Sequence, residues 1–231
     1  MTNKYLRVIV IVEIQIVLIL LVFLVVKTFN VEEKVKRTNQ FVFEVLKDKK
    51  LEEVSTIDSS DIVIGSKNAP VTMIMYSRLS CQYCKEFLST TYPELKHKYI
   101  DGGYVKFIIR FLIPNSNELG MYYAKCSYFA YKKGAFDQFT SQVVSFDEKN
   151  YLMENFRKAI IDLKIDPLGL DSYLNGSNIG NSINSKILSA YQAGISSTPC
   201  FLINGNLILG NRKFSKFEEL INDALNIINC E

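Results

Sequence analysis

Two cysteines separated by two residues, Cys81 and Cys84, have the types and spacing for joint chemistry. An apolar run from Val71 to Met75 precedes them and residues at helical spacing follow, so a strand should end and a helix begin at Cys81. Unpaired backbone N–H groups and the positive end of the helix dipole stabilise a thiolate at such a position. Because the thiolate is the reactive form of cysteine, we expect Cys81 to be a partly exposed nucleophile and Cys84 to resolve the mixed disulfide.

The same spacing is also found in zinc half-sites and in structural cysteine pairs. Zinc in a protein usually has about four ligands, but the sequence has one histidine, His97, and no second closely spaced cysteine pair. We therefore interpret the pair as redox-active and expect no metal site.

The formal net charge of +3 is too small to suggest nucleic-acid binding, and no glycine-rich phosphate loop is present. We thus expect no nucleic-acid partner and no cofactor beyond the dithiol itself. Five cysteines leave at least one free if all bonds are intramolecular. Cys126 lies on an apolar helical face and should be buried, and Cys230 should be exposed; a bridge between these two stays open, and so does the role of Cys200.

The N-terminal segment contains a nearly continuous apolar stretch from Val8 to Val26. Nineteen residues are about enough to cross a bilayer as a helix. No small-residue cleavage site follows, which favours a retained anchor over a cleaved signal peptide. Lysines and arginines flank the stretch on both sides, so the charge rule does not favour export of the C-terminal part. We choose export because a dithiol of this kind is useful outside the cytoplasm.

Residues 28–60 have mixed charge and a partial apolar helical stripe. This pattern predicts a helical stalk, with a dimerisation helix as the alternative. The predicted organisation is therefore a membrane anchor over 1–27, a stalk or linker over 28–60, and a folded domain over 61–231.

Within the domain the expected order is a short strand, the strand leading to Cys81, a helix that Pro93 should kink or interrupt, and a strand over 104–112. Two strands flanking a helix indicate a parallel βαβ unit. Several short helices should fill residues 115–193. Asn204-Gly205 predicts a hairpin turn, and a last amphipathic helix should cover about 216–228.

This order resembles the thioredoxin superfamily, and within it the DsbA-like thiol–disulfide oxidoreductases. Two motifs carry the resemblance, which starts at about Ile62: Tyr76-Ser77-x-x-Ser80-Cys81-x-x-Cys84, and Ala193-Gly194-Ile195-Ser196-Ser197-Thr198-Pro199-x-Phe201-x-Ile203-Asn204-Gly205. The implied fold is α/β: a thioredoxin fold with a helical insertion between the βαβ unit and the C-terminal ββα unit, after an N-terminal transmembrane helix.

The resemblance implies that Thr198 and Pro199 form a cis-proline loop facing the cysteines and contacting the substrate. It implies an enzyme that exchanges disulfides with exported cysteine-containing proteins, most simply by introducing disulfides during oxidative folding. A DsbB-like, quinone-linked membrane protein would re-oxidise it. The location would be the bacterial inner membrane, with the domain facing the periplasm or cell exterior, or the periplasm if the N-terminus is cleaved.

The dipeptide between the cysteines, Gln82-Tyr83, departs from the best-known DsbA pattern, Pro-His. Tyrosine at this position also resembles the isomerases DsbC and DsbG, so isomerase or reductase activity is an alternative. A copper-binding or folding-assistance module without turnover is a weaker one. The helix N-terminus alone should lower the pKa of Cys81 only to about 7, although hydrogen bonds to the sulfur could lower it further. We expect the Lys85 side chain to be solvated.

Overall fold

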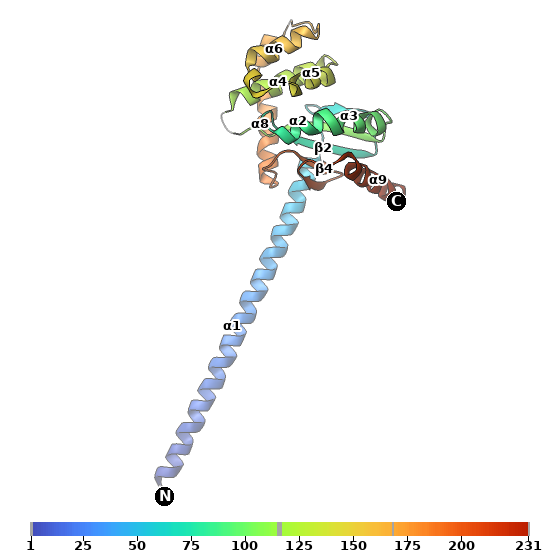
Figure 1. The fold of residues 1–231 in the computed structure, drawn as a ribbon. Helices are drawn as coiled ribbons and strands as arrows, with labels where there is room; N and C mark the ends of the chain where they lie inside the picture. Colours follow the sequence, from blue (N-terminus) through green and yellow to red (C-terminus); the bar gives the residue numbers. More distant parts are fainter. Residues whose placement is uncertain (1, 115–116, 168, 231) are drawn as a thin grey trace. The chain divides into compact units, whose positions relative to one another are not determined.

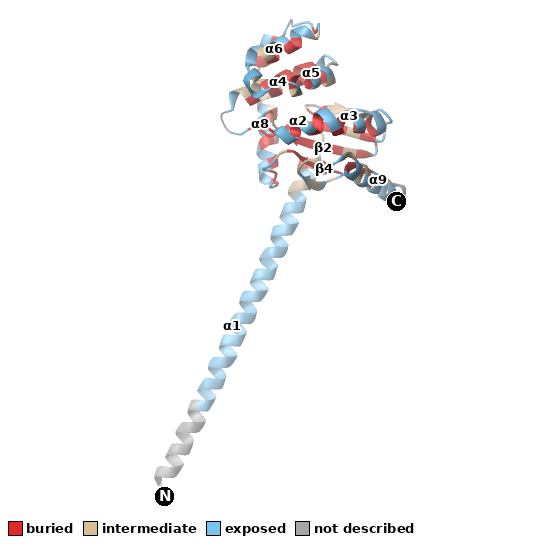
Figure 2. Cartoon of the chain, in the orientation of Figure 1, coloured by how far each residue is buried: buried red, intermediate tan, exposed pale blue. Residues whose placement is uncertain are grey.

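The computed structural model describes residues 2–114, 117–167 and 169–230, with side chains for 15–114, 117–167, 169–176 and 178–228. The chain divides into two units, residues 1–49 and 50–231. Helix α1 (Thr2–Ser55) makes up the first unit and contributes its last turn to the second. Residues 15–49 of α1 are coloured as exposed in Figure 2, whereas many residues of the second unit are coloured as buried.

The second unit is built on a five-stranded mixed sheet (Figure 1). Its strands lie in the order β1-β3-β2-β4-β5, and only the central pair β2 and β3 is parallel. The bounds are β1 (Ile62–Ile64), β2 (Val71–Ser77), β3 (Val105–Phe111), β4 (Cys200–Ile203) and β5 (Asn206–Leu209). The predicted βαβ unit and C-terminal hairpin are both confirmed.

The hairpin turn between β4 and β5 follows from two residues with positive φ. Asn204 has φ 45° and Gly205 has φ 84°, the conformation of the turn whose twist matches that of the flanking strands. Asn204 also bonds to β2, because its side chain accepts the Thr72 N–H at 2.8 Å and its own N–H donates to the Thr72 carbonyl at 2.9 Å. These bonds fix the register of the β4–β5 hairpin against strand β2.

The helical stretch between β2 and β3 changes type along its length. It begins as α2 (Gln82–Glu86), widens to a π-helical turn over Phe87–Thr91, narrows to α3 (Tyr92–Leu95) and widens again over Lys96–Ile100. Pro93 lies in the first turn of α3, where a missing N–H costs least. The predicted interruption at Pro93 thus appears as a π-turn rather than as a break.

An aromatic cluster joins one face of the sheet to the helices that cover it. Phe201 of β4 lies 4.7 Å from Phe87 and 4.8 Å from Phe217, centroid to centroid. Phe217 belongs to α9 (Phe214–Cys230), which packs on β2 and β4. Burial of such side chains contributes about 1.5–3 kcal/mol each, so this layer holds α2 and its cysteines against the sheet.

The predicted helical insertion lies between β3 and β4. It comprises α4 (Glu118–Lys132), α5 (Phe136–Val144), a 3₁₀ turn (Glu148–Asn150), α6 (Met153–Asp162), α7 (Leu170–Asn175) and α8 (Ser177–Gln192). Helices α4, α5 and α6 pack on one another and α8 packs on β3 (Figure 1). The thioredoxin fold with an inserted helical layer is therefore confirmed.

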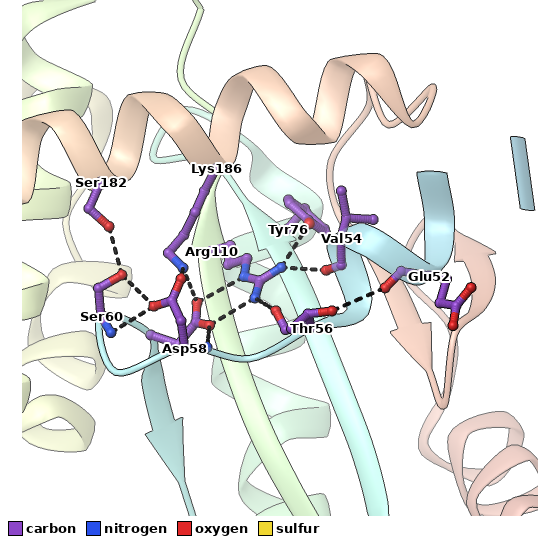
Figure 3. Close-up of polar contacts among 10 residues, drawn as sticks. Glu52, Val54, Thr56, Asp58, Ser60, Tyr76, Arg110, Ser182 and Lys186 are labelled. Carbon is purple, nitrogen blue, oxygen red and sulfur yellow. Dashed lines mark hydrogen bonds and ion pairs between the residues drawn. The ribbon is translucent and has the colours of Figure 1, made fainter. Parts of the chain in front are cut away.

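A buried ion pair, which the sequence analysis did not identify, ties the end of α1 to the sheet (Figure 3). Arg110 of β3 donates to Asp61 from Nε and Nη2, at 2.9 and 2.8 Å, and bonds to the carbonyls of Val54 and Thr56. Lys186 of α8 adds a second cation 3.1 Å from Asp61. Burial raises the pKa of Asp61, but hydrogen bonds and charge from Arg110 outweigh it, so the pKa lies below its ordinary value.

The described part of α1 also has the length and composition to cross a membrane. From Gln15 onward it includes an 18-residue window with mean hydropathy 2.0, and none of that window is buried in the protein. An anchor and a signal sequence both have this character.

Neutralising Asp61 should destabilise the fold strongly. Asp61→Asn leaves Arg110 buried without a full counter-charge, a change that typically costs about 3–5 kcal/mol. Urea unfolding of the full chain in detergent micelles, followed by near-ultraviolet circular dichroism, measures the loss. Asp162→Asn, which removes an exposed helical pair with Lys158, is the matched control and should cost far less. Equal, small losses for both variants would show that the buried pair is not a main tie.

Candidate active site

Cys81 caps the N-terminus of α2, directly after the loop that follows β2. Its backbone is extended (φ −91°, ψ 108°), and its sulfur accepts the backbone N–H of Cys84 at 3.3 Å. Its carbonyl accepts the N–H groups of Cys84 and Lys85, at 3.0 and 3.1 Å. A sulfur at the N-cap accepts an otherwise unpaired helical N–H, so the expected placement of this cysteine at the helix start is what the structure has.

The loop before β4 brings Thr198 and Pro199 against this sulfur. The Thr198–Pro199 peptide bond is cis, and the Cys81 thiol donates to the Thr198 carbonyl at 3.3 Å. Pairing of Cys200 with Tyr76 anchors the loop to β2. Segments 117 residues apart thus meet at one sulfur.

The two cysteines differ in depth, and the first is deeper than we expected. Cys81 keeps 7% of its surface and Cys84 1%, whereas Gln82 and Tyr83 are exposed. The expectation of a partly exposed Cys81 sulfur was therefore wrong for this dithiol state, because the Thr198 carbonyl covers the sulfur from the opposite loop. Cys81 is still the more exposed of the two sulfur-bearing residues.

The pKa values of the two thiols are shifted in opposite directions. A hydrogen bond from the Cys84 side chain is the main cause that lowers the pKa of Cys81 to about 5, against the opposing effect of burial. A side-chain hydrogen bond from Thr198 and the backbone N–H groups of Cys84 and Tyr83 also lower the pKa of Cys81. The value lies below the 7 expected from the helix N-terminus alone, because side chains donate as well as the backbone.

Burial raises the pKa of the other described thiols. Cys84 is shifted upward, first by burial and then by its bond to Cys81, so it stays protonated while Cys81 ionises. Burial also raises the pKa of Cys126 and of Cys200 to about 12. Both cysteines are free and buried, and burial favours the protonated, less nucleophilic form of each thiol. Cys230, and with it the possible bridge to Cys126, lies outside the described side chains.

Lys85 is not solvated as we expected. Its ammonium donates to the Phe146 carbonyl and lies 5.2 Å from the centre of the Tyr151 ring. The loop between α5 and α6 is thereby fastened to the helix that bears the cysteines. The sequence around Lys85 could not predict this contact, because both partners lie more than sixty residues further along the chain.

Three tyrosines pack in or against the hydrophobic core: Tyr76, Tyr122 and Tyr123. Tyr76 and Tyr123 are buried, and Tyr122 is partly buried. Tyr123 lines a small cavity beside Cys84, together with Arg78 and Lys85. Among the side chains that the structure describes, no group of three or more histidine, cysteine or acidic residues could hold a metal ion.

Titration of the thiolate absorbance at 240 nm tests the role of Cys84. The difference between the full chain and its Cys81→Ser variant should show a midpoint near pH 5. Cys84→Ala removes the side-chain donor and should raise this midpoint by a unit or more, on the order of 1.4 kcal/mol per unit. Cys84→Ser keeps a donor and should stay near the wild type. An unchanged midpoint in Cys84→Ala would show that the Cys84 side chain is not the main cause of the low Cys81 pKa.

Comparison with known proteins agrees with this geometry. A family model described as Thioredoxin matches residues 58–223. A protein of Rickettsia prowazekii, provisionally named protein-disulfide oxidoreductase, is 29% identical over 158 residues, 64% of this chain and 56% of its own length. This chain thus spans little more than half the length of that relative. A Bacillus cereus protein provisionally named disulfide bond formation protein D is 24% identical over 170 residues, 70% of this chain and 77% of its own.

Among solved structures, Wolbachia pipientis alpha-DsbA1 superposes with a TM-score of 0.68 at 23% identity, over 79% of this chain and 100% of its own. This likeness confirms at the level of fold the resemblance to DsbA-like proteins that the two sequence motifs predicted. The family match covers both cysteines, the cis-proline loop and the whole sheet. The chain therefore belongs to the thioredoxin family.

Proposed function

We propose that this protein is a thiol–disulfide oxidoreductase that introduces disulfide bonds into exported proteins. One observation carries the proposal: the Cys81 sulfur is held between a helix N-terminus and the Thr198–Pro199 loop, with its pKa lowered to about 5. The names of the Rickettsia and Bacillus relatives support the same chemistry.

The low pKa favours the oxidising direction. At neutral pH the reduced pair holds Cys81 as a thiolate, and whatever stabilises the thiolate makes Cys81 a better leaving group and the reduced enzyme more stable. The pKa of about 5 lies between the values of about 7 for thioredoxin and about 3.5 for DsbA. We infer an oxidant weaker than DsbA but stronger than thioredoxin.

The proposed cycle begins with the oxidised Cys81–Cys84 pair. A client thiolate attacks the Cys81 sulfur, the bond to Cys84 breaks, and Cys84 leaves as a thiolate that takes up a proton. A second client thiolate then attacks the client sulfur of the mixed disulfide and releases Cys81 as a thiolate. The client loses two electrons, the cysteine pair gains them, and a DsbB-like, quinone-linked membrane protein accepts them to restore the disulfide.

The neighbouring residues have roles in this proposal. Thr198 and Pro199 form the edge along which an extended client segment lies, and exposed Gln82 and Tyr83 face the client. No cofactor beyond the Cys81–Cys84 pair takes part.

Trapping in living cells tests the chemistry and its direction. In Cys84→Ser the Cys81 thiolate can attack a client disulfide, but no Cys84 thiol remains to release the resulting mixed disulfide, so client adducts should accumulate. Cys81→Ser should form none, and Cys126→Ala is the matched control and should behave as the wild type. Alkylation of rapidly acidified cells should find the wild-type pair mostly as a disulfide. A pair found mostly as dithiol would indicate a reductase or isomerase. Stoichiometric Cu(I) binding without adducts would indicate a copper-handling module.

We further propose that α1 anchors the protein in the bacterial inner membrane, with the folded domain on the periplasmic or external side. The apolar character of the described part of α1 supports this location.

Replacing Leu20 and Leu21 by arginine tests the anchor. A charged residue at the centre of a membrane helix costs about 2.5–3.5 kcal/mol, so the double variant should leave the carbonate-washed membrane fraction, whereas arginine at Val42 and Phe43 should not release the protein. Protease added outside spheroplasts should digest the domain. A shortened, soluble exported form of the wild type would instead indicate cleavage after a signal sequence.

A further inference from the structure

Arg78 lies in the loop between β2 and the helix that bears the cysteines. Its carbonyl accepts the Cys81 N–H at 3.1 Å, and its backbone also hydrogen-bonds to the sulfur of Cys84. The backbone of Arg78 is thus fixed relative to both sulfurs, so its side chain starts from a defined point beside the reaction.

The guanidinium of Arg78 has no counter-charge among the described residues. Its Nε is buried without a hydrogen-bond partner, and no described carboxylate lies within ion-pair distance. Arg110 and Arg157 differ in this respect, because each pairs with a carboxylate. Leaving a buried donor unpaired costs free energy, so a partner is expected when the site is occupied.

The surroundings of Arg78 favour an anion. Arg78 lines a cavity of about 70 Å³ between the end of the sheet and the insertion. Ser80, next to Cys81, also lines it, and most of its other walls are apolar, among them Leu79, Phe111, Pro114 and Tyr151. Lys85 joins Arg78 on the smaller cavity beside Cys84, and none of the described residues that line either cavity is acidic. Apolar walls strengthen charge pairing, and the volume has room for one short side chain.

We propose that Arg78 is a specificity-determining residue that binds the carboxylate of an acidic side chain next to the client cysteine. This inference rests on the proposed exchange with client proteins. A carboxylate fits best because the planar guanidinium can bind its two oxygens in parallel. A client whose thiol reaches Cys81 passes Ser80, and a side chain within one or two residues of that thiol enters the Arg78 cavity.

The test uses the oxidised full chain in detergent micelles and three dithiol peptides that differ in one residue beside a cysteine: aspartate, asparagine or lysine. The second-order rate constant for reduction of the Cys81–Cys84 disulfide is measured for the wild type and for Arg78→Gln. Comparing variants peptide by peptide removes the effect of the neighbouring charge on the reactivity of the peptide thiol itself.

Arg78→Gln should slow the aspartate peptide by about tenfold, as expected for loss of a charge-assisted bond, and should change the asparagine peptide by less than about twofold. Arg78→Lys should keep part of the preference, and the preference should weaken as salt rises. Arg37→Gln removes an equal charge from α1 and is the matched control, with no effect on either peptide. The thiolate titration of Cys81 should be unchanged in Arg78→Gln.

Equal slowing of the aspartate and asparagine peptides, or none, in both Arg78 variants would overturn the inference and leave the proposed function standing. A wild type that oxidises none of the peptides would overturn the proposed function and this inference with it.

Discussion

The chemistry of this protein depends on how one sulfur is solvated by protein in place of water. Cys81 is nearly buried, which by itself would keep its thiol protonated. The side chain of Cys84, the Thr198 hydroxyl and the N–H groups at the start of α2 outweigh that effect and bring its pKa to about 5. Burial without those donors raises the pKa instead, as it does at Cys126 and Cys200.

The donors come from two segments, and the sheet holds these segments together. Cys84 lies one helical turn from Cys81 in the same segment, whereas Thr198 arrives through β4, which pairs with the central strand β2. The aromatic layer around Phe87 and Phe201 fixes the helix on that sheet. The site therefore needs the sheet, the helix and the cis-proline loop to be in place at once.

Two arginines near this sheet differ in whether their guanidinium groups have partners. Arg110 is satisfied by Asp61 and by backbone carbonyls, and it ties the last turn of α1 to the domain. Arg78, near the cysteines, keeps a buried Nε without a partner. Arg110 therefore connects parts of the fold, whereas Arg78 is the residue for which we infer a partner on the client.

The sequence by itself determined the strand and helix around the cysteines, the parallel βαβ unit, the Asn204–Gly205 turn and the helical insertion, because local spacing and turn chemistry specify each of them. It also brought Thr198 and Pro199 to Cys81, through a family motif. Only the tertiary structure decided the depth of Cys81, the size of its pKa shift, the bond from Lys85 to Phe146 and the burial of Arg110. Each of these features depends on contacts between residues far apart in the sequence, and a local sequence pattern does not specify the distance between such residues in space.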